Sequence, residues 1–351
     1  MNNLTHPFAR IGMMLAALAL CGGCAIEQQT PEEPVAEHEA ASTLHNTVGI
    51  NGGGSNGGGS NGGGSNGGGS NGGGSNGGGS NGGGSNGEDA NLVGLTFDLT
   101  TISGLTWSGF SIVGAWFDSG GLKLLRSDGA VLSGQSLVGI EISGKLDDGS
   151  SVTLRLDEAE SFSSAVGDSL RRYVISFTRP GSDVRAYVCG KDDSGAPIKT
   201  IPITGRWNYE EGVPGGGSKE ENFTLITFAC QGYALYKCID YGYPPWKKKN
   251  GVWLNKHHQA CVRMIRADYC GDGRPWTVDG TIINLYDNLG IQVDTEGWPM
   301  EAEWDIDGAR CLSHQRIQNM PTVPECLFER TPEVCGNPPQ WGPTLLVSEA
   351  P

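Results

Sequence analysis

Long apolar runs and positive charge are both scarce in this sequence. After the ten-residue apolar segment from Ile11 to Leu20, no stretch approaches the run of about 18 apolar residues that a membrane-spanning helix needs, so we expect no further span. The 24 Lys and Arg residues are outnumbered by 39 Asp and Glu residues, which gives a formal net charge of −15. Such acidity disfavours anionic lipid headgroups as partners and predicts no nucleic-acid partner.

Closely spaced cysteine pairs are absent after residue 24. Structural zinc sites usually take two ligands a few residues apart, and no such pair of cysteines occurs there, so we predict neither a metal nor a cofactor. An even number of cysteines remains, which predicts four disulfides in an exported chain. These eight cysteines are Cys189, Cys230, Cys238, Cys261, Cys270, Cys311, Cys326 and Cys335.

Residues 1–24 have the features of a bacterial lipoprotein signal peptide. Arg10 precedes an apolar run of the length typical of a signal peptide. Gly23 is the small residue that a lipidation site needs before its cysteine, so we predict an acyl anchor at Cys24, with an ordinary secretory signal as the alternative. Ala25 follows where an Asp would favour the inner membrane. We therefore expect an extracytoplasmic cell-envelope protein, attached by lipid to the outer membrane.

Residues 25–90 contain little that can fold. Residues 27–41 are rich in Glu and Pro, and residues 51–85 are seven tandem copies of Asn-Gly-Gly-Gly-Ser. Glycine and small polar residues bury too little apolar area to offset the entropy of ordering, so the segment is predicted to be a disordered tether. The repeat would span roughly 30–35 Å on average.

Residues 91–180 are predicted to form a β-rich module. In Ser151–Leu156 every second residue is apolar, which indicates a strand with one buried face. This half of the chain has neither Cys nor His. We expect a small sandwich or barrel. Its other predicted strands are Leu122–Leu124, Ile140–Ile142, Tyr173–Phe177 and Val184–Val188.

Residues 181–340 are predicted to form a separate disulfide-rich domain, followed by a tail at 341–351. Phe223–Asp240 and Lys256–Tyr269 have helical patterns, which makes the fold class of the whole chain α+β. In an antiparallel helix pair, Cys238 would face Cys261 near the turn. Cys230 would then face Cys270 at the far end, because the separations along the two helices nearly match.

Several long motifs, among them IPITGRW (201–207) and KCIDYGYPPW (237–246), resemble segments of the ADYC-domain family, which comprises secreted and lipoprotein sequences from myxobacteria and their relatives. The signature itself is Ala267-Asp268-Tyr269-Cys270. The resemblance covers roughly residues 180–335 and implies export and a Cys-rich domain, without an established activity. Its further motifs are IPITGRW (201–207), GVPGGGS (212–218), FTLITFAC (223–230), KCIDYGYPPW (237–246), DGTIINLYDNLGIQ (279–292) and EAEWDIDGARC (301–311).

An acidic segment supplies the candidates for catalysis. If residues 301–305 form a strand, Glu301 and Glu303 share one face about 6–7 Å apart, a workable separation for hydrolysis of a glycan or peptidoglycan, with His258 as a third candidate. Solvated or turn-forming carboxylates are the alternative. A Cys-His pair of Cys261 with His257 is a weaker hypothesis, because an even number of cysteines leaves no spare thiol.

An aromatic segment before three lysines supplies candidate ligand-binding residues. Tyr241, Tyr243 and Trp246 precede Lys247–Lys249, and flat aromatic surface beside cations suits a sugar polymer or an anionic glycan. A hydrophobic turn beside a solvated basic loop is the alternative. Four further tryptophans of this half, Trp253, Trp276, Trp298 and Trp304, are expected in the core.

The leading hypothesis is therefore a non-catalytic envelope lipoprotein that binds or organises surface material. The partners expected are the membrane, through the lipid anchor, and an envelope polysaccharide or another surface protein. The competing hypothesis is an envelope-active hydrolase that uses Glu301 or Glu303.

Overall fold

A computed structural model gives the structure of the protein. It describes residues 91–102, 106–118, 120–278, 280–318, 324, 326–329 and 334–351. The predicted signal peptide, the lipid anchor at Cys24 and the tether lie outside the described residues. Within the described part, no helix is long and apolar enough to cross a membrane.

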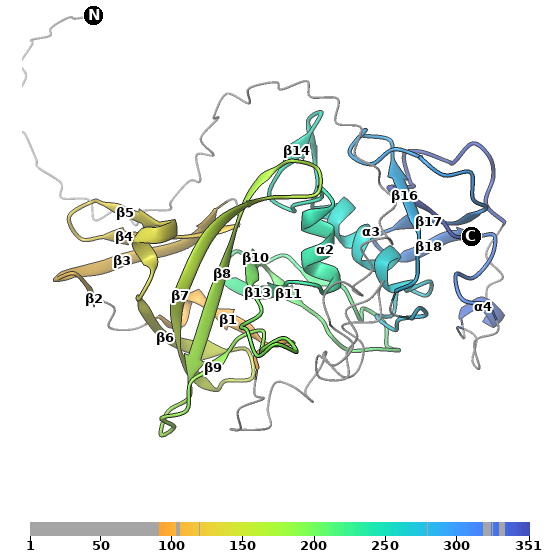
Figure 1. The fold of residues 1–351 in the computed structure, drawn as a ribbon. Helices are drawn as coiled ribbons and strands as arrows, with labels where there is room; N and C mark the ends of the chain where they lie inside the picture. Colours follow the sequence, from red (N-terminus) through yellow and green to blue (C-terminus); the bar gives the residue numbers. More distant parts are fainter. Residues whose placement is uncertain are drawn as a thin grey trace, which may run out of the picture. The chain divides into compact units, whose positions relative to one another are not determined.

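The described chain is mainly β-strand, with two helices longer than one turn (Figure 1). The strands are β1 (Thr96–Asp98), β2 (Thr106–Trp107), β3 (Phe110–Asp118), β4 (Gly121–Arg126), β5 (Val131–Ser133), β6 (Glu141–Leu146), β7 (Ser151–Ser163), β8 (Ser169–Thr178), β9 (Ala186–Tyr187), β10 (Thr200–Thr204), β11 (Arg206–Trp207), β12 (Lys219–Glu220), β13 (Leu225–Cys230), β14 (Lys248–Lys249), β15 (Val252–Trp253), β16 (Asn284–Asp287), β17 (Met300–Asp305), β18 (Gly308–Leu312) and β19 (Leu346–Glu349). The helices are η4 (Leu99–Thr101), η5 (Gly134–Leu137), α2 (Ala234–Asp240), α3 (Asn255–Arg266) and α4 (Cys326–Glu329).

Six antiparallel strands close into a barrel. They follow the order β10-β13-β1-β6-β7-β8, and β8 pairs back with β10 where Tyr173 lies opposite Thr200. Closure leaves the barrel strands without a free edge, which is where another chain could pair. The interior is filled by apolar side chains around a cavity of only about 20 Å³, so the barrel is a hydrophobic core and not a ligand chamber. Side chains around this cavity include Phe97, Ile142, Leu154, Leu156, Ile175, Ile226 and Phe228.

The alternating strand predicted at 151–156 is present in β7. Val152, Leu154 and Leu156 are buried, whereas Arg155 between them is exposed. The other predicted strands also occur, although only Ala186–Tyr187 of the segment 184–188 is in a strand. One glycine is required by the packing inside: a Cβ on Gly144 would lie 2.5 Å from the ring of Phe97.

The barrel crosses the domain boundary predicted at residue 180. Strands β10 and β13 come from the Cys-rich half, yet β13 pairs with β1, and all described residues lie in one compact unit. The two halves share one core because β10 and β13 are covered on both faces. Ile226 and Phe228 face the barrel interior, whereas Ile201 and Ala229 pack in the core around the helices. The architecture is therefore mostly β with a barrel and a short helical pair.

A second layer packs against the helices. The helix α2 contacts β13, and α3 contacts β17, β18 and β19 of a four-stranded sheet ordered β16-β19-β17-β18. The two helices thus lie between the barrel and this sheet (Figure 1). Residues 341–351, which were expected to form a tail after the domain, contribute β19 to this sheet. Leu346 and Val347 are fully buried there, and β19 is an inner strand.

The helical prediction for 223–240 is only half right. Residues 225–230 form β13, and the helix α2 begins at Ala234. The second predicted helix is present as α3, and it ends where Ala267 adopts a left-handed backbone conformation with φ of 51°. The strand escaped the sequence analysis because a short apolar run buried on both faces has no alternation to mark it.

The eight cysteines after residue 24 form four disulfides. Cys238 pairs with Cys261, as predicted, and joins α2 to α3. The antiparallel arrangement expected for these helices is wrong, because their contacts follow the same order along both: Leu235 lies against His258, and Cys238, three residues later, bonds Cys261. The predicted pairing of Cys230 with Cys270 is wrong, because Cys230 lies at the end of a barrel strand and not on a helix. The other three bonds are Cys189–Cys230, Cys270–Cys326 and Cys311–Cys335.

Candidate functional site

The Ala267–Cys270 motif lies directly after α3, and each of its residues has a structural contact. Ala267 ends the helix in the left-handed conformation and is fully buried. Asp268 accepts hydrogen bonds from the backbone N–H groups of Asp272 at 3.0 Å and Gly273 at 2.8 Å. The Tyr269 hydroxyl donates to Oε1 of Glu301 at 2.7 Å, and Cys270 forms its disulfide with α4. The motif therefore joins α3 to the loop after it, to β17 and to α4.

Asp268 is also the partner of Arg263 in an ion pair that is 1% exposed on both sides. Arg263 further donates to the carbonyl oxygens of Gly216 at 2.6 Å and Ile306 at 3.1 Å, and to Oγ of Ser218 at 2.9 Å. Burial raises the pKa of Asp268, while the Arg263 guanidinium acts in the opposite direction. This arginine thereby ties the glycine-rich loop 212–218 and the turn after β17 to α3.

Glu301, the first catalytic candidate, lies in a second enclosed ion pair. Its Oε2 accepts from Nη2 of Arg316 at 3.0 Å and from Oγ of Ser348 at 2.8 Å. Neither the glutamate nor the arginine has exposed surface. Arg316 also donates to the carbonyl oxygens of Met264 and Ile265, so it satisfies acceptors in the last turn of α3. A carboxylate held in this way cannot reach a polymeric substrate without local unfolding.

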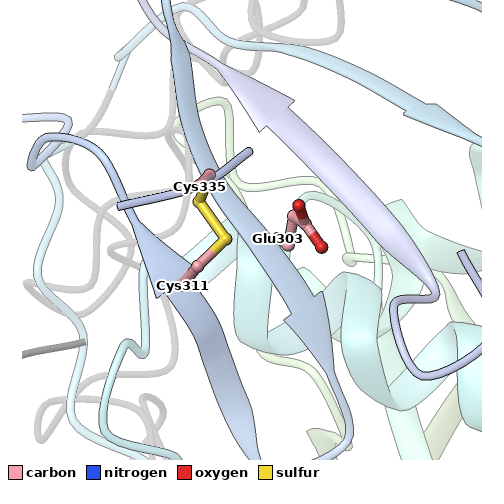
Figure 2. Close-up of side chains that lie close together, drawn as sticks. All are labelled: Glu303, Cys311 and Cys335. Atoms are coloured by element: carbon pink, nitrogen blue, oxygen red, sulfur yellow. A yellow bond between two sulfur atoms is a disulfide. The ribbon is translucent and has the colours of Figure 1, made fainter. Parts of the chain in front are cut away.

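Glu303, the second candidate, is also buried and lies beside the Cys311–Cys335 disulfide (Figure 2). It accepts hydrogen bonds from the Thr344 hydroxyl and from the backbone N–H of Gln340. One carboxylate oxygen and the two sulfur atoms lie within 4.8 Å of one another, a spacing suited to a metal ion. Both sulfurs are consumed by the disulfide, however, so this group offers no thiolate ligand.

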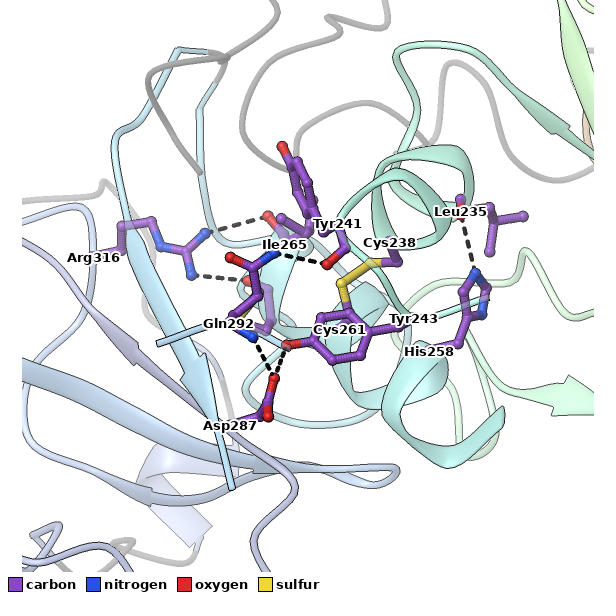
Figure 3. The surroundings of a disulfide bond; sticks show 11 residues. Leu235, Cys238, Tyr241, Tyr243, His258, Cys261, Ile265, Asp287, Gln292 and Arg316 are labelled. Carbon is purple, nitrogen blue, oxygen red and sulfur yellow. Dashed lines mark hydrogen bonds between the residues drawn. A yellow bond between two sulfur atoms is a disulfide. The ribbon is translucent and has the colours of Figure 1, made fainter. Parts of the chain in front are cut away.

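His258, the third candidate, lies on a different side of the helical layer. Its ring is fully buried, with Nε2 3.0 Å from the carbonyl oxygen of Leu235 and its edge against Trp207. Burial lowers the pKa of His258 to about 3. Figure 3 places His258 and Arg316, the partner of Glu301, on opposite sides of the Cys238–Cys261 disulfide. The three candidates are thus separate buried groups that share no cleft lining, and the Cys261 thiol of the weaker hypothesis is in the disulfide.

The predicted ligand-binding aromatics are mostly core residues. Tyr243 is fully buried and its hydroxyl donates to Oδ2 of Asp287 at 2.6 Å, as Figure 3 shows. Tyr241 is 6% exposed, and its carbonyl oxygen accepts from the Gln292 side chain. Trp246 is half-buried, and its ring lies against Gly120. Tyr241 and Tyr243 therefore offer no aromatic surface to a ligand.

The exposed aromatic residue of this region is one that the sequence analysis assigned to the core. Trp253 is 47% exposed in the β14–β15 hairpin, and the Lys248 ammonium lies 4.5 Å from the centre of its ring. The missed signal is Asn250-Gly251, a pair typical of two-residue hairpin turns. Both residues have positive φ, 51° and 80°. The other tryptophans differ: Trp276 and Trp304 are buried, and Trp298 is half-buried.

A small cavity of about 30 Å³ lies between the barrel and the helices. It is lined by Trp207, Tyr209, Phe228, Tyr233 and Arg266, among others. This volume holds one or two water molecules and excludes a sugar or a peptide. None of the three catalytic candidates lines it.

Comparison with known protein families gives one match. The ADYC domain matches residues 134–318, more than half of the chain, and the match begins within the barrel, well before the expected limit near residue 180. Comparison with curated proteins and with solved structures found no match. The matched region contains the signature loop, both enclosed ion pairs and five of the six barrel strands in full. The chain therefore belongs to the ADYC-domain family.

Proposed function

We propose that this protein is a lipid-anchored, non-catalytic binding module of the cell envelope, which holds or organises polysaccharide or other surface material. The proposal rests on one observation, which is that the three residues predicted as catalytic candidates are buried. Glu301, Glu303 and His258 are enclosed, and each is engaged by internal partners. Catalytic groups must contact their substrate, whereas these groups join segments of the fold to one another.

The disulfides support an oxidising compartment for the domain. Four disulfides use all the cysteines after residue 24, and such bonds form and persist outside the cytosol. The signal-like N-terminal segment with Cys24 would attach the protein to the membrane, and the Gly-rich repeat would link the anchor to the folded part. An acyl anchor stabilises membrane attachment by about 0.8 kcal/mol per buried methylene, and the tether holds the folded part at a distance from it.

Two measurements on the full chain test the proposal. Intact mass of the protein extracted from membranes of an exporting bacterium should contain an acyl modification, and Cys24→Ser should abolish it. Isolated peptidoglycan and envelope polysaccharide should retain the protein without release of soluble sugars. Unmodified mass, failure to bind any envelope fraction, or sugar release that Glu303→Gln abolishes would each overturn the proposal.

A further inference from the structure

We propose that the β14–β15 hairpin, through Lys248, Lys249 and Trp253 together with Lys256 at the start of α3, binds an acidic polysaccharide. This inference rests on the proposed binding function and names its site and ligand class. In this proposal Trp253 takes the place of the buried residues Tyr241 and Tyr243 as the aromatic residue that contacts the ligand.

The first argument is local charge. From residue 241 to residue 267 the chain has six Lys and Arg residues and no Asp or Glu, although the whole chain carries a net charge of −15. Arg263 and Arg266 are buried in internal ion pairs, and Lys247 pairs with Asp168 at 2.9 Å. Lys248, Lys249 and Lys256 are exposed, and none of them is in an ion pair with a described carboxylate. They form a basic patch on an acidic protein.

The second argument is the geometry of the hairpin. Lys248 lies opposite Trp253, and Lys249 lies opposite Val252, so each face of the two-stranded ribbon carries one cation and one apolar side chain. Val252 is 41% exposed, and the hairpin is braced by a hydrogen bond from the Leu254 backbone N–H to the Lys247 carbonyl oxygen. Figure 1 shows it projecting from the helical layer. A projecting ribbon of this kind can lie along an extended polymer.

The third argument distinguishes a glycan from a lipid surface. The Lys248 ammonium covers one face of the Trp253 ring. Insertion of that ring into hydrocarbon would either carry the ammonium with it or break the cation–π contact, and both are costly. An acidic polysaccharide makes no such demand, because its carboxylates meet the ammonium groups and its C–H surfaces pack on the exposed part of the ring. Repulsion by the rest of the acidic surface would direct a polyanion to this patch.

The test uses the full chain with Cys24→Ser, so that vesicle binding does not report on the anchor. Polygalacturonate is the acidic probe, neutral dextran is the control polymer, and phosphatidylglycerol vesicles test a lipid surface. The variants are Lys248→Gln with Lys249→Gln, and Trp253→Ala. The matched control is Lys145→Gln with Lys191→Gln, which removes the same charge from two exposed lysines elsewhere.

We expect retention on polygalacturonate that weakens with salt, and no retention on dextran. Each hairpin variant should weaken binding at least about fivefold, and the control variant less than about twofold. Equal weakening by the control variant, or a hairpin-dependent interaction with vesicles alone, would overturn the assignment. If isolated envelope polysaccharide binds the wild type and the hairpin variants equally, this site is wrong while the binding function stands. If no envelope material binds the wild type, the proposed function itself fails.

Discussion

Glu301 and Arg316 form an ion pair from which water is fully excluded, 3.0 Å apart and with no exposed surface on either side chain. The pair joins β17 to the segment that follows β18. It also joins both to the end of α3, because Arg316 donates to the carbonyl oxygens of Met264 and Ile265. One of the two glutamates proposed from the sequence as catalytic candidates thus connects the helical layer to the second sheet.

Removal of Arg316 should therefore destabilise the fold strongly. Arg316→Ala leaves Glu301 charged, buried and short of a partner, which costs about 3–5 kcal/mol in the free energy of unfolding. Urea unfolding followed by tryptophan fluorescence measures the change. The matched control is Arg310→Ala on β18, whose ion pair with Asp305 is half-exposed and worth roughly 0–1 kcal/mol. Equal losses in the two variants would contradict the structural role of the enclosed pair.

The loop 212–218 offers a second matched comparison, between two glycines with positive φ. A Cβ on Gly217 would lie 2.6 Å from Nη1 of Arg263 and 2.9 Å from the Cα of Gly273. A Cβ on Gly215 would meet no atom within 4 Å. Gly215→Ala should cost about 1–2 kcal/mol for its left-handed backbone alone, and Gly217→Ala should cost clearly more, because Arg263 is held by its other hydrogen bonds and cannot move aside.

Urea unfolding of the two variants measures the difference. A Gly217→Ala protein as stable as Gly215→Ala would show that the loop moves away without cost. The packing of this loop on Arg263 would then not be a determinant of the fold.

The barrel strands with one exposed face could be predicted from the sequence, because alternation in β7 and β6 reports that face directly. Strand β13 could not, since it is covered on both sides and its apolar run resembles a buried helix. The same run led to the wrong partner for Cys230. The Cys238–Cys261 bond could be predicted because the two segments that carry these cysteines have helical patterns and their helices lie side by side.

The contacts of the signature loop could not be predicted from the sequence. Arg263 donates to Gly216, 47 residues before it, and to Ile306, 43 residues after it. No local pattern reports hydrogen bonds across such separations. The hairpin with Trp253 is different, because Asn250-Gly251 is a strong local turn signal that the sequence analysis did not use.

The Cys238–Cys261 disulfide should contribute substantially to stability. It closes a separation of 23 residues between α2 and α3, and the entropy of loop closure predicts about 3 kcal/mol for a loop of this size. The double substitution Cys238→Ala with Cys261→Ala should lower the free energy of unfolding by this order, measured by urea unfolding without reductant. The remaining disulfides, counted by mass before and after reduction, serve as the control for correct pairing. An unchanged midpoint of unfolding would show that the helix pair does not depend on the bond.

The buried ring of His258 should make the fold sensitive to acid. Burial lowers its pKa to about 3, whereas an unfolded histidine titrates near 6.5. The unfolded state then binds more protons between these values, so the stability present above pH 6.5 is lost as the pH falls, by about 2 kcal/mol at pH 5. His258→Gln keeps a donor for the Leu235 carbonyl and removes the titration, so its stability should fall less steeply with acid, by up to about 1.4 kcal/mol per pH unit. Urea unfolding between pH 5 and 7.5 compares the two slopes, and NMR titration of the ring measures its pKa directly. Parallel stability curves, or a ring that titrates near 6.5 in the folded protein, would show that His258 is not enclosed as the structure has it.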